Sequence, residues 1–320
     1  MLLCHFHRLS PHIVGECWAC MCLGFVYHRY NAEFRRQRKL TLLILKEFGF
    51  GRNIMEERIQ TEVSVLLQKV RDVKSMAFYP LSAVTSCILN VIVSILFGRR
   101  MEDKAVVKLS KVTHDLMHSV ACLRVVAFLP VLRFLPQARR AITTSVALHD
   151  QLFDFIRNSI ETSDEDSFVR YYMNHEGSKL DREQLEYIVR DLVLAGSETT
   201  TSTLMWAMVL LAGRDGQHVQ ERLWKEIDSQ VPRELLPSLA HRSHMPFVEA
   251  TILEVMRVRT VVPLSLFHET SCDTTVGGFF IPANTIVSIS AMLFVILLAL
   301  VFMVKIVVTV TSASMSLLVM

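Results

Sequence analysis

The sequence has few of the residues that make turns. Its 320 residues include only 11 glycines and 9 prolines, whereas average usage gives roughly 22 and 16 at this length. This shortage predicts long helices joined by few hairpins. It excludes a β-sandwich, a collagen-like chain and a disordered protein. The length allows a sizeable core in one or two domains.

The chain also lacks an excess of charge of either sign. The sequence has 34 Lys and Arg residues and 31 Asp and Glu residues, for a net charge of +3. Basic and acidic residues are too nearly equal in number to indicate a nucleic-acid partner. The seven cysteines are odd in number, and their spacing is not that of a disulfide framework. This usage is ordinary for a protein in a reduced compartment. No second ligand pair at regular spacing follows the cluster Cys17, Cys20 and Cys22. We therefore interpret residues 1–23 as a divergent N-terminal segment with free thiols rather than a metal site.

Charged residues are nearly missing from the C-terminal end. Residues 286–320 carry one charge, Lys305, and 27 of these 35 residues are hydrophobic. The uncharged run 286–304 would reach about 28 Å as a helix, close to the hydrocarbon thickness of a bilayer. A buried core helix is the alternative, but such helices rarely lack charge over this length. We expect a transmembrane helix at about 286–304, within a hydrophobic tail at 288–320.

Apolar residues elsewhere recur mostly at helical spacing, and the fold class we expect is mainly α with a small β portion. Asp181, followed by Gln184, resembles a capping box and starts the longest helix, which ends near Ala212. The residues Thr274–Pro282 read as a β-hairpin with a turn at Gly277-Gly278. The other expected helices are two within 30–75, broken at Gly49 and Gly51, and one each at 81–97 (ended by Gly98), 104–123, 138–160, 218–231 and 246–258.

The first motif that carries chemistry is Ala195-Gly196-Ser197-Glu198-Thr199-Thr200, in the middle of the longest helix. Glycine inside a helix lowers helix stability by about 1 kcal/mol relative to alanine. Its presence here therefore calls for an explanation. Threonine hydroxyls can bond back to preceding carbonyls and open the helix ladder. A groove with a carboxylate and a hydroxyl suits the transfer of protons to a bound group. The alternative is a threonine-rich packing face with an exposed glutamate.

The second motif is Glu254-x-x-Arg257. Spacing of three residues places both side chains on one helix face, and the apolar neighbours lead us to expect a pair that is at least partly buried. A buried ion pair persists only when further hydrogen bonds complete it. Alone the motif is a weak signal, because surface helices contain it constantly.

The order and separation of these motifs resemble the cytochrome P450 family of haem-thiolate monooxygenases, and the microsomal drug- and steroid-metabolising group above all. The resemblance covers about 24–287 and implies an incomplete cytochrome P450 fold. Four stretches carry it: Gly24 to Tyr27 with Tyr30 to Arg38; Asn90-Val91-Ile92 to Leu96-Phe97-Gly98; Ala195 to Thr200; and Glu254 to Arg257 with Pro263 to His268 and Gly277 to Pro282. In the first stretch, Phe34 stands where the family has tryptophan.

The resemblance implies a role for each matched residue. Arg38 and His268 would donate to the haem propionates, and Phe34 would keep the aromatic packing beside them. Glu198 and Thr199 would relay protons to bound dioxygen, while Ala195 and Gly196 would leave room over the iron. Glu254 and Arg257 would form the structural pair. Leu194, Val261, Val262 and Leu264 would line the substrate pocket.

The family's iron ligand has no counterpart in these 320 residues. That ligand is a cysteine thiolate in a loop of the form Phe-x-x-Gly-x-x-x-Cys-x-Gly. The only cysteine after Arg257 is Cys272, which lacks the loop's phenylalanine and glycines, so we interpret Cys272 as structural. The sequence resembles the middle of a cytochrome P450 with foreign ends.

Two functions therefore stay open. The resemblance implies a membrane-bound monooxygenase of the endoplasmic reticulum, which inserts one oxygen atom from O2 into a lipophilic substrate with electrons from NADPH-cytochrome reductase. The alternative is a non-catalytic, tail-anchored helical membrane protein that cannot form the haem-thiolate centre. Retention of haem by this chain is the point that separates them.

Overall fold

A computed structural model describes residues 24–25, 30–48, 53–74, 76–128, 130–176, 181–263, 265–266, 268–288 and 290. The chain divides into two compact units, Met1–Ala250 and Thr251–Met320, and each is described by itself. Helices dominate the described residues and the strands are short, which confirms the predicted mainly α class.

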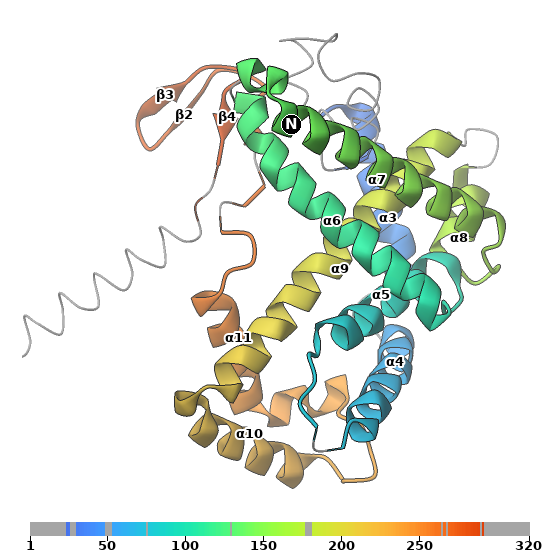
Figure 1. The fold of residues 1–320 in the computed structure, drawn as a ribbon, viewed down its shortest axis with the longest axis vertical. Helices are drawn as coiled ribbons and strands as arrows, with labels where there is room; N and C mark the ends of the chain where they lie inside the picture. Colours follow the sequence, from blue (N-terminus) through green and yellow to red (C-terminus); the bar gives the residue numbers. More distant parts are fainter. Residues whose placement is uncertain are drawn as a thin grey trace, which may run out of the picture. The chain divides into compact units, whose positions relative to one another are not determined.

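The first unit is a set of packed helices (Figure 1). Helix α5 lies against α9, and α6 lies against α7. The helices are α3 (Ala32–Glu47), α4 (Asn53–Asp72), α5 (Leu81–Phe97), α6 (Asp103–Phe128), α7 (Pro136–Glu161), α8 (Phe168–Glu176), α9 (Arg182–Ala212), α10 (Gln217–Gln230) and the start of α11 (Pro246–Val258), with 3-10 turns η2 (Pro130–Phe134), η4 (Arg214–Gly216) and η5 (Leu239–His244).

The helix boundaries follow the capping signals in the sequence. Asp181 is the N-cap of α9, and its side chain accepts a hydrogen bond from the Gln184 backbone N–H at 3.1 Å. Gly98 ends α5 in the left-handed conformation, with φ of 78°. A Cβ at Gly98 would lie 2.7 Å from the Cβ of Asp164, so both the dihedral angle and the close approach require glycine here.

The hydrophobic core of this unit lies where α5, α7, α8 and α9 meet. Side chains such as Leu89, Phe97, Ile156, Phe168 and Ile188 have at most 1% of their surface exposed. Helix α8 was not predicted from the sequence, although Phe168, Val169 and Tyr172 follow helical spacing and are all buried in this core.

A polar cluster is buried between α7 and α9. Arg190 Nη2 lies 2.6 Å from Asp191 Oδ1, and its Nη1 lies 3.3 Å from His149 Nε2. All three residues are less than 10% exposed. Burial, followed by the charges of Arg190 and Arg157, lowers the pKa of His149 to about 4. The imidazole is therefore neutral, and its Nε2 can accept from the guanidinium.

The second unit contains two small antiparallel sheets. Strand β1 (His268–Glu269) pairs with β4 (Ile286–Val287), and β2 (Thr274–Val276) pairs with β3 (Phe279–Ile281). Positive φ at both Gly277 and Gly278 makes the predicted glycine turn of the β2–β3 hairpin.

The start of the predicted transmembrane helix is wrong. Ile286 and Val287 belong to strand β4, where they pair with Glu269 and His268, so no helix begins at 286. Residues 289 and 291–320, which include the rest of the predicted helix, lie outside the described residues, as do 1–23. Among the residues that are described, no helix is both long enough and apolar enough to cross a membrane.

Candidate functional site

The middle of α9 has the hydrogen-bonding pattern expected from its motif. Thr199 Oγ1 donates to the carbonyl oxygen of Ala195 at 2.7 Å, and Ser197 and Thr203 donate to the carbonyls of Val193 and Thr199 in the same way. Such bonds add a second donor to helix carbonyls. The predicted back-bonding of the threonine hydroxyl is confirmed.

Gly196 lies where α5 packs closely on α9. A Cβ at this position would lie 2.9 Å from Cδ1 of Ile92 on α5. The family resemblance implies a different reason for this glycine, namely room over the iron. The contact with Ile92 is tighter than an ordinary van der Waals approach, so a larger residue here must shift the terminal methyl group of Ile92.

We expect Gly196→Ala to depend on Ile92. Alanine favours the helix by about 1 kcal/mol, but its methyl group must displace Ile92 Cδ1. In an Ile92→Val background, which lacks Cδ1, Gly196→Ala should be more favourable by about 1 kcal/mol than in the parent chain. Urea unfolding of the four variants measures this coupling. Additive effects would mean that the approach of α5 does not explain the glycine.

Glu198 and Thr199 engage different partners. Glu198 Oε2 lies 3.7 Å from Nδ1 of His114 on α6, and the His114 side chain is 62% exposed. The carboxylate is therefore partly exposed beside an imidazole that lies beyond hydrogen-bond distance, whereas the Thr199 hydroxyl is held by its own helix. Leu194 and Ala195 lie on the same helix, partly exposed and exposed respectively. His114 was missed in the sequence because it lies far from the motif along the chain.

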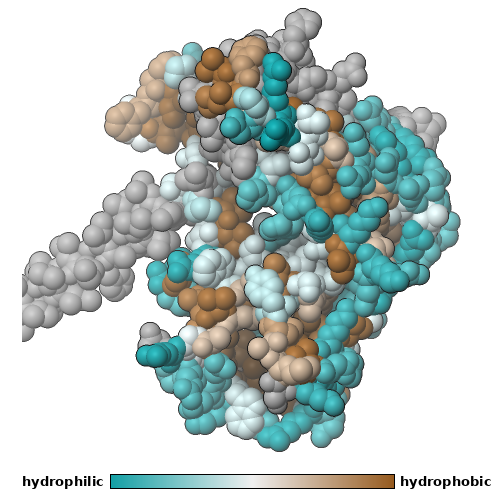
Figure 2. Space-filling view, in the orientation of Figure 1, coloured by the Kyte–Doolittle hydropathy of each residue, from teal (hydrophilic) through white to brown (hydrophobic). Residues whose placement is uncertain are grey.

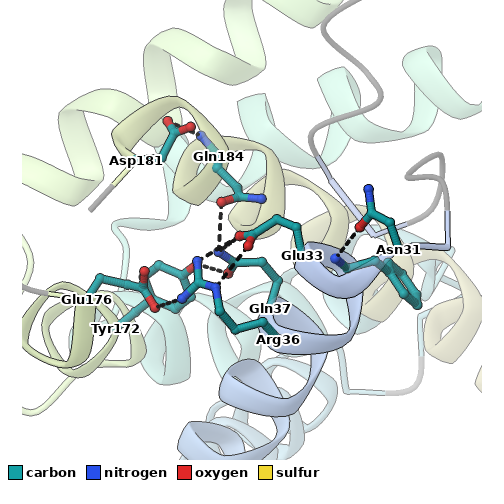
Figure 3. Close-up of polar contacts among 9 residues, drawn as sticks. Asn31, Glu33, Arg36, Gln37, Tyr172, Glu176, Asp181 and Gln184 are labelled. Atoms are coloured by element: carbon teal, nitrogen blue, oxygen red, sulfur yellow. Dashed lines mark hydrogen bonds and ion pairs between the residues drawn. The ribbon is translucent and has the colours of Figure 1, made fainter. Parts of the chain in front are cut away.

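Helix α3 is held along one face by a polar network with α8 and α9 (Figure 3). Arg36 Nη1 donates to Glu176 Oε1 at 2.6 Å. Gln37 Nε2 donates to Gln184 Oε1 at 2.7 Å, and its Oε1 accepts from the Tyr172 hydroxyl. Glu33 completes the network, as it accepts from both Arg36 and Gln37. The network fixes the rotation of α3 about its own axis.

The energetics of this network follow from burial. Gln37, Gln184, Glu176 and Tyr172 are all buried, and each has a partner, as buried polar groups require. Hydrogen bonds to Glu33 and Glu176 raise the pKa of Arg36. Burial of the phenol raises the pKa of Tyr172, so Tyr172 remains the donor to Gln37.

The opposite face of α3 lines an open groove of about 660 Å³, a volume within the range of small-molecule sites. The predicted pair Phe34 and Arg38 lie in it together. Its other lining residues are Tyr30, Arg35, Lys39, Leu42, Leu43, Lys46 and Glu47. The groove thus combines four cations with an apolar floor, which suits an amphipathic anion.

The second unit holds the other predicted site residues. Arg257 donates twice to Glu254, at 2.7 and 2.6 Å, and hydrogen bonding to Arg257 lowers the pKa of Glu254. The pair is bidentate, but its side chains are 59% and 52% exposed, so the expected burial is wrong. The reason is that of the α11 residues only Val255 is buried.

The remaining predicted residues of this unit are near the surface. His268 is exposed on β1, Val262 is exposed and Val261 is partly buried. Leu264 lies outside the described residues.

The described side chains fit the acidic edge of a haem but do not supply its iron ligand. The cations and Phe34 of the α3 groove suit a planar apolar ring with carboxylates. Cys272 is exposed in the second unit, and Cys87 is buried, with its pKa raised to about 11 by burial and by the charge of Glu62. A thiol with such a pKa is not a thiolate near neutral pH. Nor does any group of three or more His, Cys, Asp or Glu that could hold a metal occur in the described part.

Comparisons with known proteins give a consistent result. The sequence model of the family "Cytochrome P450" matches residues 22–294. The chain is 31% identical to "Cytochrome P450 2U1" of Bos taurus over 82% of its length and 51% of that protein. It is 32% identical to "Cytochrome P450 2D14" of Bos taurus, over 82% and 55% of the two chains. It is 31% identical to "Cytochrome P450 2J2" of Homo sapiens, over 79% and 53%.

The family match covers most of this chain, and it includes α3, α5, α9, α11 and the β2–β3 hairpin. The chain therefore belongs to the cytochrome P450 family. It spans about half the length of the curated relatives it matches.

Proposed function

We propose that this chain carries the oxygen side and the propionate side of a haem monooxygenase site, which inserts one oxygen atom from O2 into a lipophilic substrate with reductase-supplied electrons. The observation that carries the proposal is the joint presence of the Ala195–Thr200 motif with its back-bonded Thr199 and the cationic α3 groove with Phe34 and Arg38. Haem, when bound, supplies the oxygen chemistry, and the chain's residues bind, orient and move protons.

Each residue has a specific part in this proposal. Arg38 and His268 donate to haem carboxylates, since a guanidinium and an imidazole form charge-assisted hydrogen bonds with them. The Thr199 hydroxyl donates its proton in a hydrogen bond to the Ala195 carbonyl, so its lone pairs can accept a hydrogen bond from a donor bound beside α9. Glu198, beside the exposed His114, exchanges protons with solvent. Leu194, Val261, Val262 and Leu264 contribute the apolar substrate pocket, and Glu254 with Arg257 remains a structural pair.

A second function is favoured by one observation. Cys272, the only cysteine after Arg257, is exposed and stands outside the motif of the family's thiolate loop. As the alternative we propose a non-catalytic, tail-anchored helical membrane protein, in the endoplasmic reticulum, that cannot form the haem-thiolate centre. The domain limits of 24–287, and a tail anchor within 288–320, stay predictions.

A spectroscopic experiment separates these functions. The 320-residue chain is titrated with haem, reduced and exposed to carbon monoxide. We expect no thiolate-type Soret shift, because none of the seven cysteines in the sequence stands in a loop of the family's form Phe-x-x-Gly-x-x-x-Cys-x-Gly. A thiolate-type shift would contradict the non-catalytic proposal.

The same titration tests the α3 groove. Arg38→Ala should weaken haem binding about tenfold, because it removes one charge-assisted hydrogen bond. Arg71→Ala, at an exposed position near the end of α4, is the matched control and should leave the affinity unchanged. Equal affinities of the two variants would show that the groove does not hold the haem carboxylates.

A further inference from the structure

Asn90 on α5 is a buried side chain with only one end of its amide in use. Its Oδ1 accepts a hydrogen bond from the Met101 N–H at 3.1 Å, and 1% of the residue is exposed. Its Nδ2 is buried and donates to no group in the described part of the chain. Exchange of the two ends of the amide would turn Nδ2 toward the Met101 N–H, which is also a donor. Asn90 is therefore a buried donor that needs an acceptor.

A small cavity lies between α4 and α5, and Asn90 forms part of its wall. The cavity offers about 10 Å³ of space for a water-sized sphere, which matches one water molecule and is far too small for an organic ligand. The other polar residues that line it are Glu62, Lys69, Ser86, Cys87 and Arg100. Because Oδ1 is held by Met101, Nδ2 is the polar atom that Asn90 can offer to the cavity.

The charges beside this cavity balance one another. Glu62 Oε1 lies 2.7 Å from Nε of Arg100. Asp103 forms ion pairs with Lys69 and Arg100, at 3.1 and 3.4 Å. These two cations and two carboxylates have no net charge. An anion in the cavity would face the buried Glu62 carboxylate, and a cation would face the amide hydrogens of Asn90. The cavity therefore suits a neutral molecule that forms hydrogen bonds.

Burial changes from one end of this charged cluster to the other. The Glu62 side chain is 5% exposed, whereas those of Lys69, Arg100 and Asp103 are 37%, 41% and 56% exposed. Figure 2 shows hydrophilic side chains along the edge of the first unit where Figure 1 draws α4. Solvent thus reaches the outer groups of the cluster, and Glu62 is its inner group. Water is the neutral molecule available at this edge.

We propose that one water molecule binds in this cavity and bridges α4 to α5. It accepts from Asn90 Nδ2 and donates to the Glu62 carboxylate, and the Ser86 hydroxyl is its third partner. Buried waters ordinarily make about three such bonds. An unpaired buried donor destabilises a fold more than the ordering of one water does. Because Asn90 also holds the Met101 N–H, the water connects α4 to the turn that precedes α6.

Nuclear magnetic resonance of the full chain in detergent, with isotope-labelled asparagine, tests this bridge. Asn90→Asp assigns the Asn90 side-chain signal by removing it. In the parent chain the Asn90 amide hydrogens should show a nuclear Overhauser effect to water, of the sign typical of a long-lived contact. The amide of Asn174, at an exposed position on α8, is the internal control and should show none. Absence of the effect at Asn90 would overturn the proposal.

Two substitutions of Ser86 locate the water. Ser86→Ala removes the hydroxyl but leaves the space, so the effect at Asn90 should persist. Ser86→Val fills the cavity and should abolish the effect, whereas Ser64→Val, at an exposed position on α4, should leave it unchanged.

Either of two results with these variants would also overturn the proposal. Loss of the effect in Ser86→Ala shows that the signal came from exchange with the hydroxyl. Persistence of the effect in folded Ser86→Val shows that the water lies elsewhere. Where Ser86→Val does not fold, the parent and Ser86→Ala spectra still decide the question. Because the readout involves no haem, failure of the monooxygenase proposal leaves this test unaffected.

Discussion

Replacing Asp191 with alanine is expected to lower the free energy of unfolding by about 3–5 kcal/mol. The substitution leaves Arg190, of which 1% of the side chain is exposed, buried without the carboxylate that lies 2.6 Å from it. An uncompensated charge inside the core costs far more than the pair contributes when intact. Urea unfolding followed by far-UV circular dichroism, in detergent, measures the change.

The control for this prediction is Asp228→Ala. Asp228 forms an ion pair of similar length with Arg233, at 2.7 Å, but that arginine is 71% exposed. Solvent replaces the lost partner there, so the urea midpoint should hardly move. Similar midpoints for the Asp191 and Asp228 variants would show that burial does not decide the cost of breaking these pairs.

Acid is expected to destabilise the chain through His149. The pKa of His149 is lowered to about 4 in the folded chain, whereas an unfolded histidine titrates near 6.5. Between these values the unfolded chain binds a proton that the folded chain does not, so stability falls as the pH drops from about 6.5 to about 4. The full loss from this group is about 3 kcal/mol.

His149→Gln isolates this contribution, because glutamine keeps a hydrogen-bond acceptor but does not titrate. The free energy of unfolding of wild type should fall relative to that of the variant as the pH drops from about 6.5 to about 4, and the difference should stay constant below that range. His218→Gln, at an exposed position on α10, is the matched control. Parallel profiles for wild type and His149→Gln would contradict the assignment.

Local signals made much of the fold predictable. The residues Asp181 and Gly98 mark helix ends through hydrogen bonding and dihedral freedom that depend on a few neighbours. Helix α8 was missed because its nine residues are stabilised mainly by burial of Phe168 and Tyr172 in a core made by distant helices. Such burial leaves only a short pattern in the sequence.

The site was predictable in its residues but not in its contacts. Phe34 and Arg38 share one groove, as their spacing of four residues on a helix allows. The approach of Ile92 to Gly196, the position of His114 near Glu198 and the exposure of Glu254 with Arg257 depend on how whole helices pack. A sequence motif specifies none of these. Ile92 and His114 lie far from α9 along the chain, and the exposure of Glu254 and Arg257 depends on which residues pack against α11.

The network that holds α3 also has a consequence for the timing of folding during synthesis. The hydrogen bond of Arg36 cannot form until Glu176, 140 residues later, has been synthesised. That of Gln37 likewise requires Gln184, which is 147 residues later. At roughly 5–20 residues per second on the ribosome, this delay is about 7–30 s. During that interval the cationic α3 segment lacks its partners on α8 and α9, so its buried polar groups stay in contact with water or other molecules until those helices are made.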